Sequence, residues 1–157
     1  MKAKMKKLFS IKSIPILALA LLIVLGSALA AGRDPVSGSG EATLDLSTGA
    51  ATGTATLNIR GEEFTTLVAV QITGQVISDE GVTHVTSTHT FTFDNGSITT
   101  TDKGVIDTDG TLNEHLTIIS GTDDFEGACG ELRVHGQIQF QPPMAYVSYD
   151  IRGAISR

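Results

Sequence analysis

Apolar and polar side chains alternate in several segments of the chain, so that each segment has one apolar face and one polar face. In the segment 82–93, for example, Val85, Phe91 and Phe93 share one face and four threonines take the other. This period of two is typical of β-strands that cover a core on one side. No stretch after residue 40 shows a convincing apolar stripe of helical period. The pattern predicts eight strands, at about 41–47, 53–60, 64–78, 82–93, 97–107, 111–119, 130–140 and 145–155.

Turn signals separate these segments. Asp94-Asn95-Gly96-Ser97 predicts a two-residue hairpin, since Asn-Gly tolerates the positive φ of a type I′ turn. Gln141-Pro142-Pro143 predicts a loop, since proline cannot donate to a sheet ladder. Eight antiparallel strands with short connections and one apolar face can close on themselves and leave no free edge. The sequence therefore predicts an all-β fold, an eight-stranded antiparallel up-and-down β-barrel, with a two-sheet sandwich as the alternative.

The first thirty residues differ in character from the rest. Residues 1–12 carry five lysines and no acid, an apolar run interrupted only by Pro15 follows from Ile14 to Leu25, and Ala28-Leu29-Ala30 fits a cleavage site. This pattern is typical of a secretory signal peptide, and the run is shorter than the roughly 20 residues that span a bilayer. We therefore predict a cleaved signal peptide at 1–30, a flexible leader at 31–40 and a barrel domain at 41–157. The protein would be secreted or periplasmic; an uncleaved membrane anchor is the alternative.

The charge balance excludes two classes of partner. The chain has 11 basic and 17 acidic side chains, and five of the basic ones lie within the first twelve residues. Residues 31–157 therefore carry 6 basic and 17 acidic side chains, a formal net charge of −11. Such a body repels nucleic acid and anionic membrane surfaces. We expect no nucleic-acid partner, and contact with a membrane only transiently during export.

The segment 120–130 carries a family resemblance. Ser120-Gly121-Thr122-Asp123-Asp124-Phe125-Glu126-Gly127-Ala128-Cys129-Gly130 resembles the glycine-rich turn of the allene oxide cyclase and dirigent-like barrel families, and the segment 146–153 is similar to the last strand of the cyclases. The resemblance implies an eight-stranded, calycin-like barrel with a central apolar cavity. Members are often trimers, and plant relatives cyclise an unsaturated fatty-acid epoxide or guide the radical coupling of phenols. A homotrimer is also favoured by the apolar residues on the predicted outer face of 64–78, namely Leu67, Ala69 and Ile77.

The glycine-rich segment also has a backbone role that the residues themselves indicate. Its glycines, Gly121, Gly127 and Gly130, allow conformations that other residues avoid. Phe125 is then placed to plug one end of the barrel, although the segment also makes sense as a fold signature without chemistry. Cys129, the single cysteine, is read as a small buried thiol.

Three polar residues fall on faces that are predicted to point inward. His89 and Glu114 each share parity with apolar neighbours in their strands, and Tyr149 lies in the last strand. A buried polar group needs a partner or water, and burial would raise the pKa of an inward glutamate. We therefore name His89, Glu114 and Tyr149 as candidate catalytic residues. The alternatives are that Glu114 reaches water at the barrel mouth, or that a β-bulge turns both His89 and Glu114 to solvent.

Metal and cofactor motifs give no signal in the sequence. The four histidines, at 84, 89, 115 and 135, never occur at the spacing of a metal-binding motif. One cysteine cannot form an internal disulfide or a cysteine-rich zinc site. No dinucleotide-binding or phosphate-binding loop is present. We expect no metal and no cofactor.

Three functional hypotheses follow from these features. The first is a secreted barrel that binds an apolar small molecule in its central cavity without turnover. The second is a cofactor-free cyclase or isomerase acting on an unsaturated lipid-like or polyketide-like substrate. The third is a structural or assembly protein with a filled barrel. The residues predicted to line the cavity are Val85, Phe91, Phe93, Leu112, Leu116, Phe125, Leu132 and Val147.

Overall fold

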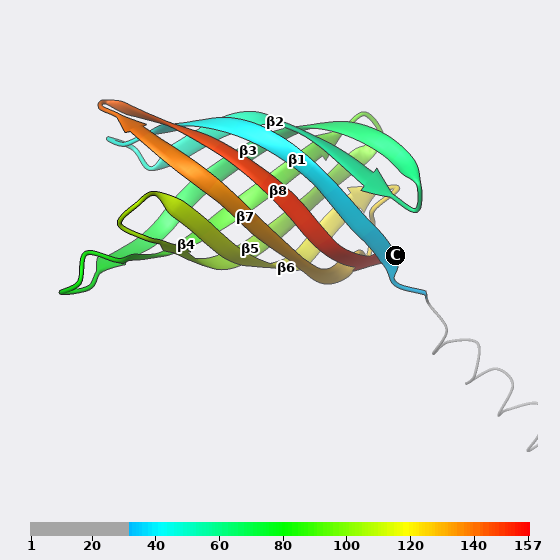
Figure 1. Ribbon diagram of the computed structural model, residues 1–157. Coiled ribbons are helices and arrows are strands. Elements are labelled where there is room, and N and C mark those ends of the chain that lie inside the picture. Colours follow the sequence, from blue (N-terminus) through cyan, green and yellow to red (C-terminus); the bar gives the residue numbers. More distant parts are fainter. Residues whose placement is uncertain (1–31) are drawn as a thin grey trace, which may run out of the picture. The chain divides into compact units, whose positions relative to one another are not determined.

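The alternating apolar positions lie on the inner wall of a closed β-barrel. The computed structural model describes residues 32–157, which form eight antiparallel strands that follow one another around the barrel (Figure 1). The strands are β1 Asp34–Asp45, β2 Ala50–Ile59, β3 Glu62–Ile77, β4 Thr83–Phe93, β5 Gly96–Ile106, β6 Thr111–Asp123, β7 Cys129–Gln141 and β8 Met144–Ser156. β1 pairs with β2 on one side and with β8 on the other, which closes the sheet. The predicted up-and-down barrel is thus confirmed, and the two-sheet alternative is wrong.

The first thirty-one residues are not part of this description. The predicted signal peptide at 1–30 lies outside the described residues, and export stays a prediction. In residues 32–157 no helix is long and apolar enough to cross a membrane.

The predicted flexible leader at 31–40 is wrong, because residues from Asp34 onward belong to β1. The glycines that suggested a mobile linker are needed for close packing between strands instead. A Cβ on Gly38 would collide with the carbonyl oxygen of Thr56, and a Cβ on Gly40 would lie 2.6 Å from the ring of Tyr149. The barrel domain therefore begins at the start of β1 rather than at residue 41.

The core fills one half of the barrel more completely than the other. Phe125 is fully buried in the β6–β7 turn, and its ring centroid lies 4.7 Å from that of Phe93. The guanidinium of Arg157 lies over the same ring, 5.3 Å from its centroid. Phe125 therefore plugs the end where the β2–β3, β4–β5 and β6–β7 turns lie, which we call the Phe125 end. The opposite end, with the β1–β2, β3–β4, β5–β6 and β7–β8 turns, is the mouth.

The glycine-rich turn uses its glycines in different ways. Gly127 has a φ of 75°, and a Cβ there would meet no atom within 4 Å. Gly121 has no positive φ, but a Cβ on it would collide with the carbonyl of Phe125. Backbone hydrogen bonds from Phe125 to Thr122 and from Ala128 to Phe125, each 2.9 Å long, hold the turn. One glycine therefore serves a left-handed conformation and the other a close approach.

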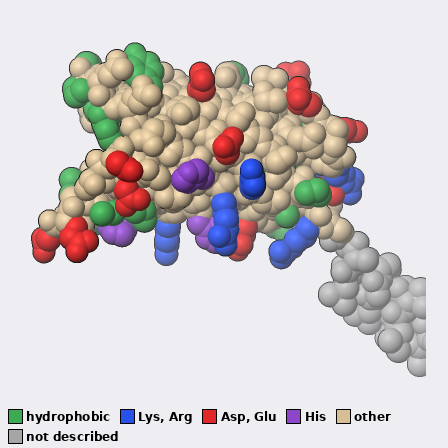
Figure 2. All heavy atoms as spheres, in the orientation of Figure 1, with side chains coloured by type: hydrophobic (Ala, Val, Ile, Leu, Met, Phe, Trp, Pro, Cys, Tyr) green, Lys and Arg blue, Asp and Glu red, His purple; other side chains and the backbone are tan. Residues whose placement is uncertain are grey.

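The outer wall is polar with a few exposed apolar side chains. Leu67 and Ala69 point outward as predicted, and Leu67 is 64% exposed. Ile77 is also exposed, but the register shift between Ile72 and Gly74 places it opposite Thr83, on the face that carries Val85, so its predicted outer-face position is wrong. The homotrimer stays a prediction. Figure 2 shows apolar side chains gathered where β7 and β8 meet at the mouth. Cys129 is exposed, so the interpretation as a buried thiol is wrong: Leu132 of β7 faces inward, which sends Cys129 to the outer face.

Gly127→Val is expected to lower the free energy of unfolding by about 1–3 kcal/mol, because a β-branched residue is strained at positive φ. Gly127→Asn is the matched control, since asparagine tolerates this region, and we expect a smaller loss. Chemical denaturation of the variants measures both. Equal stability of Gly127→Val and the unmodified chain would show that the turn does not require a left-handed residue.

Candidate functional site

Three neighbouring strands place polar side chains on the inner wall of the barrel. Ser87 and His89 come from β4, Asp102 from β5 and Glu114 from β6. Ser87 lies opposite Asp102 in the sheet, while Glu114 lies opposite Gly104. Because Gly104 has no side chain, the Cγ of Glu114 occupies space only 2.8 Å from where a Cβ would be. This vacancy brings the glutamate next to the polar groups of β4 and β5.

Hydrogen bonds fix the orientation of this cluster. The backbone N–H and the hydroxyl of Ser87 both donate to Oδ1 of Asp102, each over 2.6 Å. The Nε2 of His89 lies 3.0 Å from the Ser87 Oγ. A hydroxyl has one proton to give, and Asp102 receives it. The Nε2 of His89 therefore carries the proton of the second bond and donates it to Ser87.

The remaining carboxylate oxygen of Asp102 faces the histidine without a hydrogen bond. Its Oδ2 is buried and unpartnered, and lies 3.5 Å from Nε2 of His89. Oε2 of Glu114 lies 3.9 Å from the same nitrogen. The side chain of Asp102 is 0% exposed, that of His89 8% and that of Glu114 9%. Two carboxyl groups and an imidazole thus meet in a place that water barely reaches.

The two carboxyl groups differ in protonation because their surroundings differ. Burial alone would raise the pKa of Asp102, but the nearby His89 imidazole and the hydrogen bonds from Ser87 outweigh it and hold the pKa below its usual range. Burial raises the pKa of Glu114 well above its usual value, and the nearby charge of Asp102 raises it further. Asp102 is therefore the anion of the cluster, and Glu114 is its proton-bearing partner.

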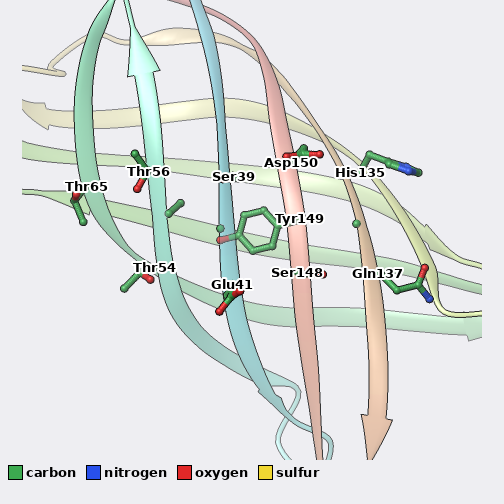
Figure 3. Close-up of a pocket in the computed structure, with 13 residues that line it drawn as sticks. Ser39, Glu41, Thr54, Thr56, Thr65, His135, Gln137, Ser148, Tyr149 and Asp150 are labelled. Atoms are coloured by element: carbon green, nitrogen blue, oxygen red, sulfur yellow. The ribbon is translucent and has the colours of Figure 1, made fainter.

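Tyr149 reaches the inner wall from β8 between two glycines. It lies opposite Gly40 of β1 and Gly136 of β7 in the sheet. In Figure 3 its ring lies between the β8 and β1 ribbons, which requires that Gly40 lack a side chain. Its hydroxyl is buried without a partner. Burial and the charge of Glu114 raise the pKa of Tyr149 to about 12, so the phenol keeps its proton at physiological pH.

A cavity of about 70 Å³ lies between the polar cluster and the mouth. Ser87, His89, Glu114 and Tyr149 are its polar lining, and the other lining residues are apolar or alanine. A groove of about 410 Å³ adjoins it at the rim of the mouth. The residues shared by the cavity and the rim groove are Leu44, Ile72, Val85 and Ile106.

A larger hollow lies elsewhere, on the outer wall over β1, β2, β7 and β8 (Figure 3). It measures about 610 Å³ and is a shallow groove with polar side chains such as Glu41, His135 and Asp150. Its depth comes partly from Gly40 and Gly136, which leave the wall thin beside Tyr149. None of its side chains except Tyr149 lines the cavity described above.

The predicted site residues lie in two places, on the cavity wall and in the core away from it. His89, Glu114 and Tyr149 point inward and all line the cavity; no bulge reverses β4, and the shift in the β5–β6 pairing lies beyond Glu114. Their chemical role stays a prediction. The predicted cavity residues Val85, Phe91, Leu112 and Val147 line the cavity. Phe93, Leu116, Phe125 and Leu132 are buried but do not line it.

Sequence reasoning missed Asp102 and Ser87. The inner face of β5 reads Ile98, Thr100, Asp102, Gly104 and Ile106, so it lacks the apolar stripe that reveals an inward face. The available signal was that Asp102 lies on the same face of the strand as Ile98 and Ile106. With Asp102 in place, His89, Asp102 and Glu114 offer three ligand atoms that all lie within 4.8 Å of one another, the only such group in the described part of the chain.

Comparisons with known proteins give a structural likeness. No protein-family model matches the chain, and no curated protein matches it. The chain is similar to the solved structure of a pterocarpan synthase dirigent protein, with 12% sequence identity, coverage of 99% of this chain and 100% of that chain, and a TM-score of 0.42. The resemblance to allene oxide cyclases stays a prediction. The candidate site is therefore defined by the positions of this chain's own residues.

Glu114→Gln is expected to stabilise the protein near neutral pH and to do nothing in acid. The pKa of Glu114 is higher in the folded than in the unfolded chain. The unmodified protein therefore loses stability as pH rises above about 4.5, by up to about 1.4 kcal/mol per pH unit, until the folded-state pKa is passed. Glutamine does not ionise, so the variant escapes this loss.

Denaturation over a pH series, with a chelator present, measures the effect. Glu131→Gln is the control, because Glu131 is 65% exposed on the outer wall; its stability should stay within about 0.5 kcal/mol of the unmodified chain. If the stability of Glu114→Gln ran parallel to that of the unmodified chain at every pH, the surroundings of Glu114 would not be raising its pKa.

Proposed function

We propose that the barrel binds a small molecule with an apolar body and one uncharged polar end. The observation that supports this is the cavity itself, which is lined mainly by apolar side chains and by Tyr149, whose hydroxyl is buried without a partner. A buried donor without a partner costs about 1–3 kcal/mol. A ligand oxygen that accepts from Tyr149 would remove this cost, so the polar end enters first.

The size of the cavity limits what can enter it. Its 70 Å³ is about half of the ~150 Å³ cavity that holds benzene. Only a small group, such as an acetyl group, fits beside the polar cluster. The rim groove of about 410 Å³ adjoins the cavity and is lined by both apolar residues, including Leu46 and Phe140, and polar ones such as Thr48 and Gln75. An alkyl or aryl body would lie there, with its polar end in the cavity.

The charge of the site selects against acids. Asp102 is a buried anion, and a ligand carboxylate would be repelled by it in a poorly solvated interior. Tyr149, with a pKa of about 12, offers a proton at any physiological pH. The preferred polar end is therefore a ketone, ether, ester or alcohol. The sequence of residues 1–30 predicts that such a molecule is met outside the cytoplasm.

A second candidate is a cofactor-free isomerase or cyclase. It is favoured by the position of Glu114 and Tyr149, whose proton-bearing groups both line the cavity. A cyclase needs little beyond a defined substrate conformation and one group that gives or takes a proton. Such an enzyme would convert the bound molecule, whereas the binding protein would return it unchanged. Mass spectrometry of ligand recovered after incubation distinguishes the two.

Methyl ketones of increasing chain length test the binding proposal. We expect their affinity to increase by about 0.8 kcal/mol per buried methylene until the rim groove is filled. The fatty acid of equal length should bind more weakly because of Asp102. Calorimetric titration of metal-free protein measures both series.

Ala42→Phe and Ala69→Phe form a matched pair for this test. Ala42 lines the cavity from β1, whereas Ala69 is exposed on the outer face of β3. The first substitution should abolish ketone binding and the second should leave it unchanged, with a thermal midpoint showing that both fold. Ketone binding that survives Ala42→Phe, or that is absent from the unmodified protein, contradicts a ligand in the barrel.

A further inference from the structure

We propose that His89, Asp102 and Glu114 form a binding site for a divalent transition metal of tetrahedral preference, of which Zn²⁺ is the model ion. The ligand atoms are Nε2 of His89, Oδ2 of Asp102 and Oε2 of Glu114. They come from three adjacent strands, β4, β5 and β6, and lie within 4.8 Å of one another. Metal binding would release the proton of Glu114 and displace the proton that Nε2 donates to Ser87 in the metal-free protein, leaving His89 in its other tautomer. Motif spacing in the sequence does not reveal such a site, because each strand supplies one ligand.

The distances fit a four-coordinate ion. Zinc bonds of about 2.0–2.1 Å to nitrogen and oxygen place tetrahedral ligand atoms about 3.4 Å apart. Nε2 of His89 is 3.5 Å from Oδ2 of Asp102 and 3.9 Å from Oε2 of Glu114. Octahedral coordination at similar bond lengths would need separations of about 2.9 Å and six ligands. The two carboxylate oxygens lie within 4.8 Å of each other, so Glu114 would move toward His89 and Asp102 to complete the tetrahedral geometry.

An independent observation also points to a cation. Oδ2 of Asp102 is buried, has no hydrogen-bond partner and faces His89. Leaving part of a charged group unsatisfied in the interior is costly, and a metal ion would satisfy it. Ser87 holds the other oxygen, Oδ1, with two hydrogen bonds. That is the arrangement by which an outer residue aims a carboxylate at a metal.

The donor set and the charge agree with this ion. One imidazole nitrogen and two carboxylate oxygens suit zinc and its neighbours in the first transition row, whereas calcium and magnesium need more oxygen ligands. Two carboxylates balance the charge of a divalent cation. Three protein ligands leave a fourth position, which is the pattern of zinc sites that also take water or a substrate atom. His89 and Glu114 line the cavity, so this position is open to it.

This inference does not depend on the proposed function. The three ligand atoms are in place without any organic molecule, and ketone binding is tested on metal-free protein. Failure of one proposal therefore leaves the other standing. Where both hold, a carbonyl oxygen in the cavity lies within reach of the fourth position.

Metal titration of the untagged protein, stripped with a chelator and then dialysed, tests the site. Calorimetry with Zn²⁺ should give one ion per chain with micromolar or tighter affinity. Co²⁺ should give the intense visible bands of a four-coordinate ion. His89→Gln and Asp102→Asn should each weaken binding beyond the roughly 10–100-fold loss expected when an outer-shell partner is removed. Ser87→Ala removes a residue that positions Asp102 without binding the metal, so its loss of metal affinity should fall within that range.

His115→Gln is the matched control. His115 also lies near a carboxylate, 3.4 Å from Glu131, but on the exposed outer wall. Its loss should leave affinity and the Co²⁺ spectrum unchanged. Absence of stoichiometric binding by the unmodified protein overturns the proposal, as does an octahedral Co²⁺ spectrum or an equal loss in His115→Gln and His89→Gln. The spectrum of the unmodified protein decides the matter even if a variant fails to fold.

Discussion

The buried negative charge of Asp102 is the constraint on which the interior depends. A carboxylate without exposure to solvent persists only if hydrogen bonds replace water, and Ser87 supplies two of them to one oxygen. The same charge helps to keep the neighbouring Glu114 protonated by raising its pKa. Tyr149 in turn is held in its neutral form by burial and by Glu114. Burial is the largest cause of both raised pKa values, and the charge of Asp102 adds to it at Glu114.

Barrel closure makes this arrangement possible. Strands β4, β5 and β6 each contribute to the cluster, and none of them holds it alone. Glycines in the sheet leave room for the larger polar side chains: Gly104 for Glu114 and Gly40 for Tyr149. The aromatic plug at Phe125 closes the other end, and the cavity beside the polar cluster lies toward the mouth. The glycines are therefore as much a part of the site as the residues that line it.

Much of the fold could be predicted from the sequence, because side chains alternate between the two faces of a strand. Wherever one face is apolar, the alternation shows which residues point inward. That rule gave the closed barrel and the inward positions of His89, Glu114 and Tyr149. It failed in β1, where Gly38 and Gly40 were interpreted as part of a linker. The sequence does not show at which glycines a neighbouring strand leaves no room for a side chain. The rule failed in β5 too, where Thr100, Asp102 and Gly104 hide the inner face. Which residues meet across strands depends on register, and register needed the structure.

The protonation states of Asp102 and Glu114 test the central claim most directly. Carbon-13 NMR of the two side-chain carboxyl carbons, assigned with Asp102→Asn and Glu114→Gln, reports each state as pH is varied in metal-free protein. The account predicts that Asp102 stays ionised to a pH below its usual pKa, while Glu114 stays protonated well above 4.5. A Glu114 carboxyl that titrates near 4.5, or a protonated Asp102 at neutral pH, would contradict the account.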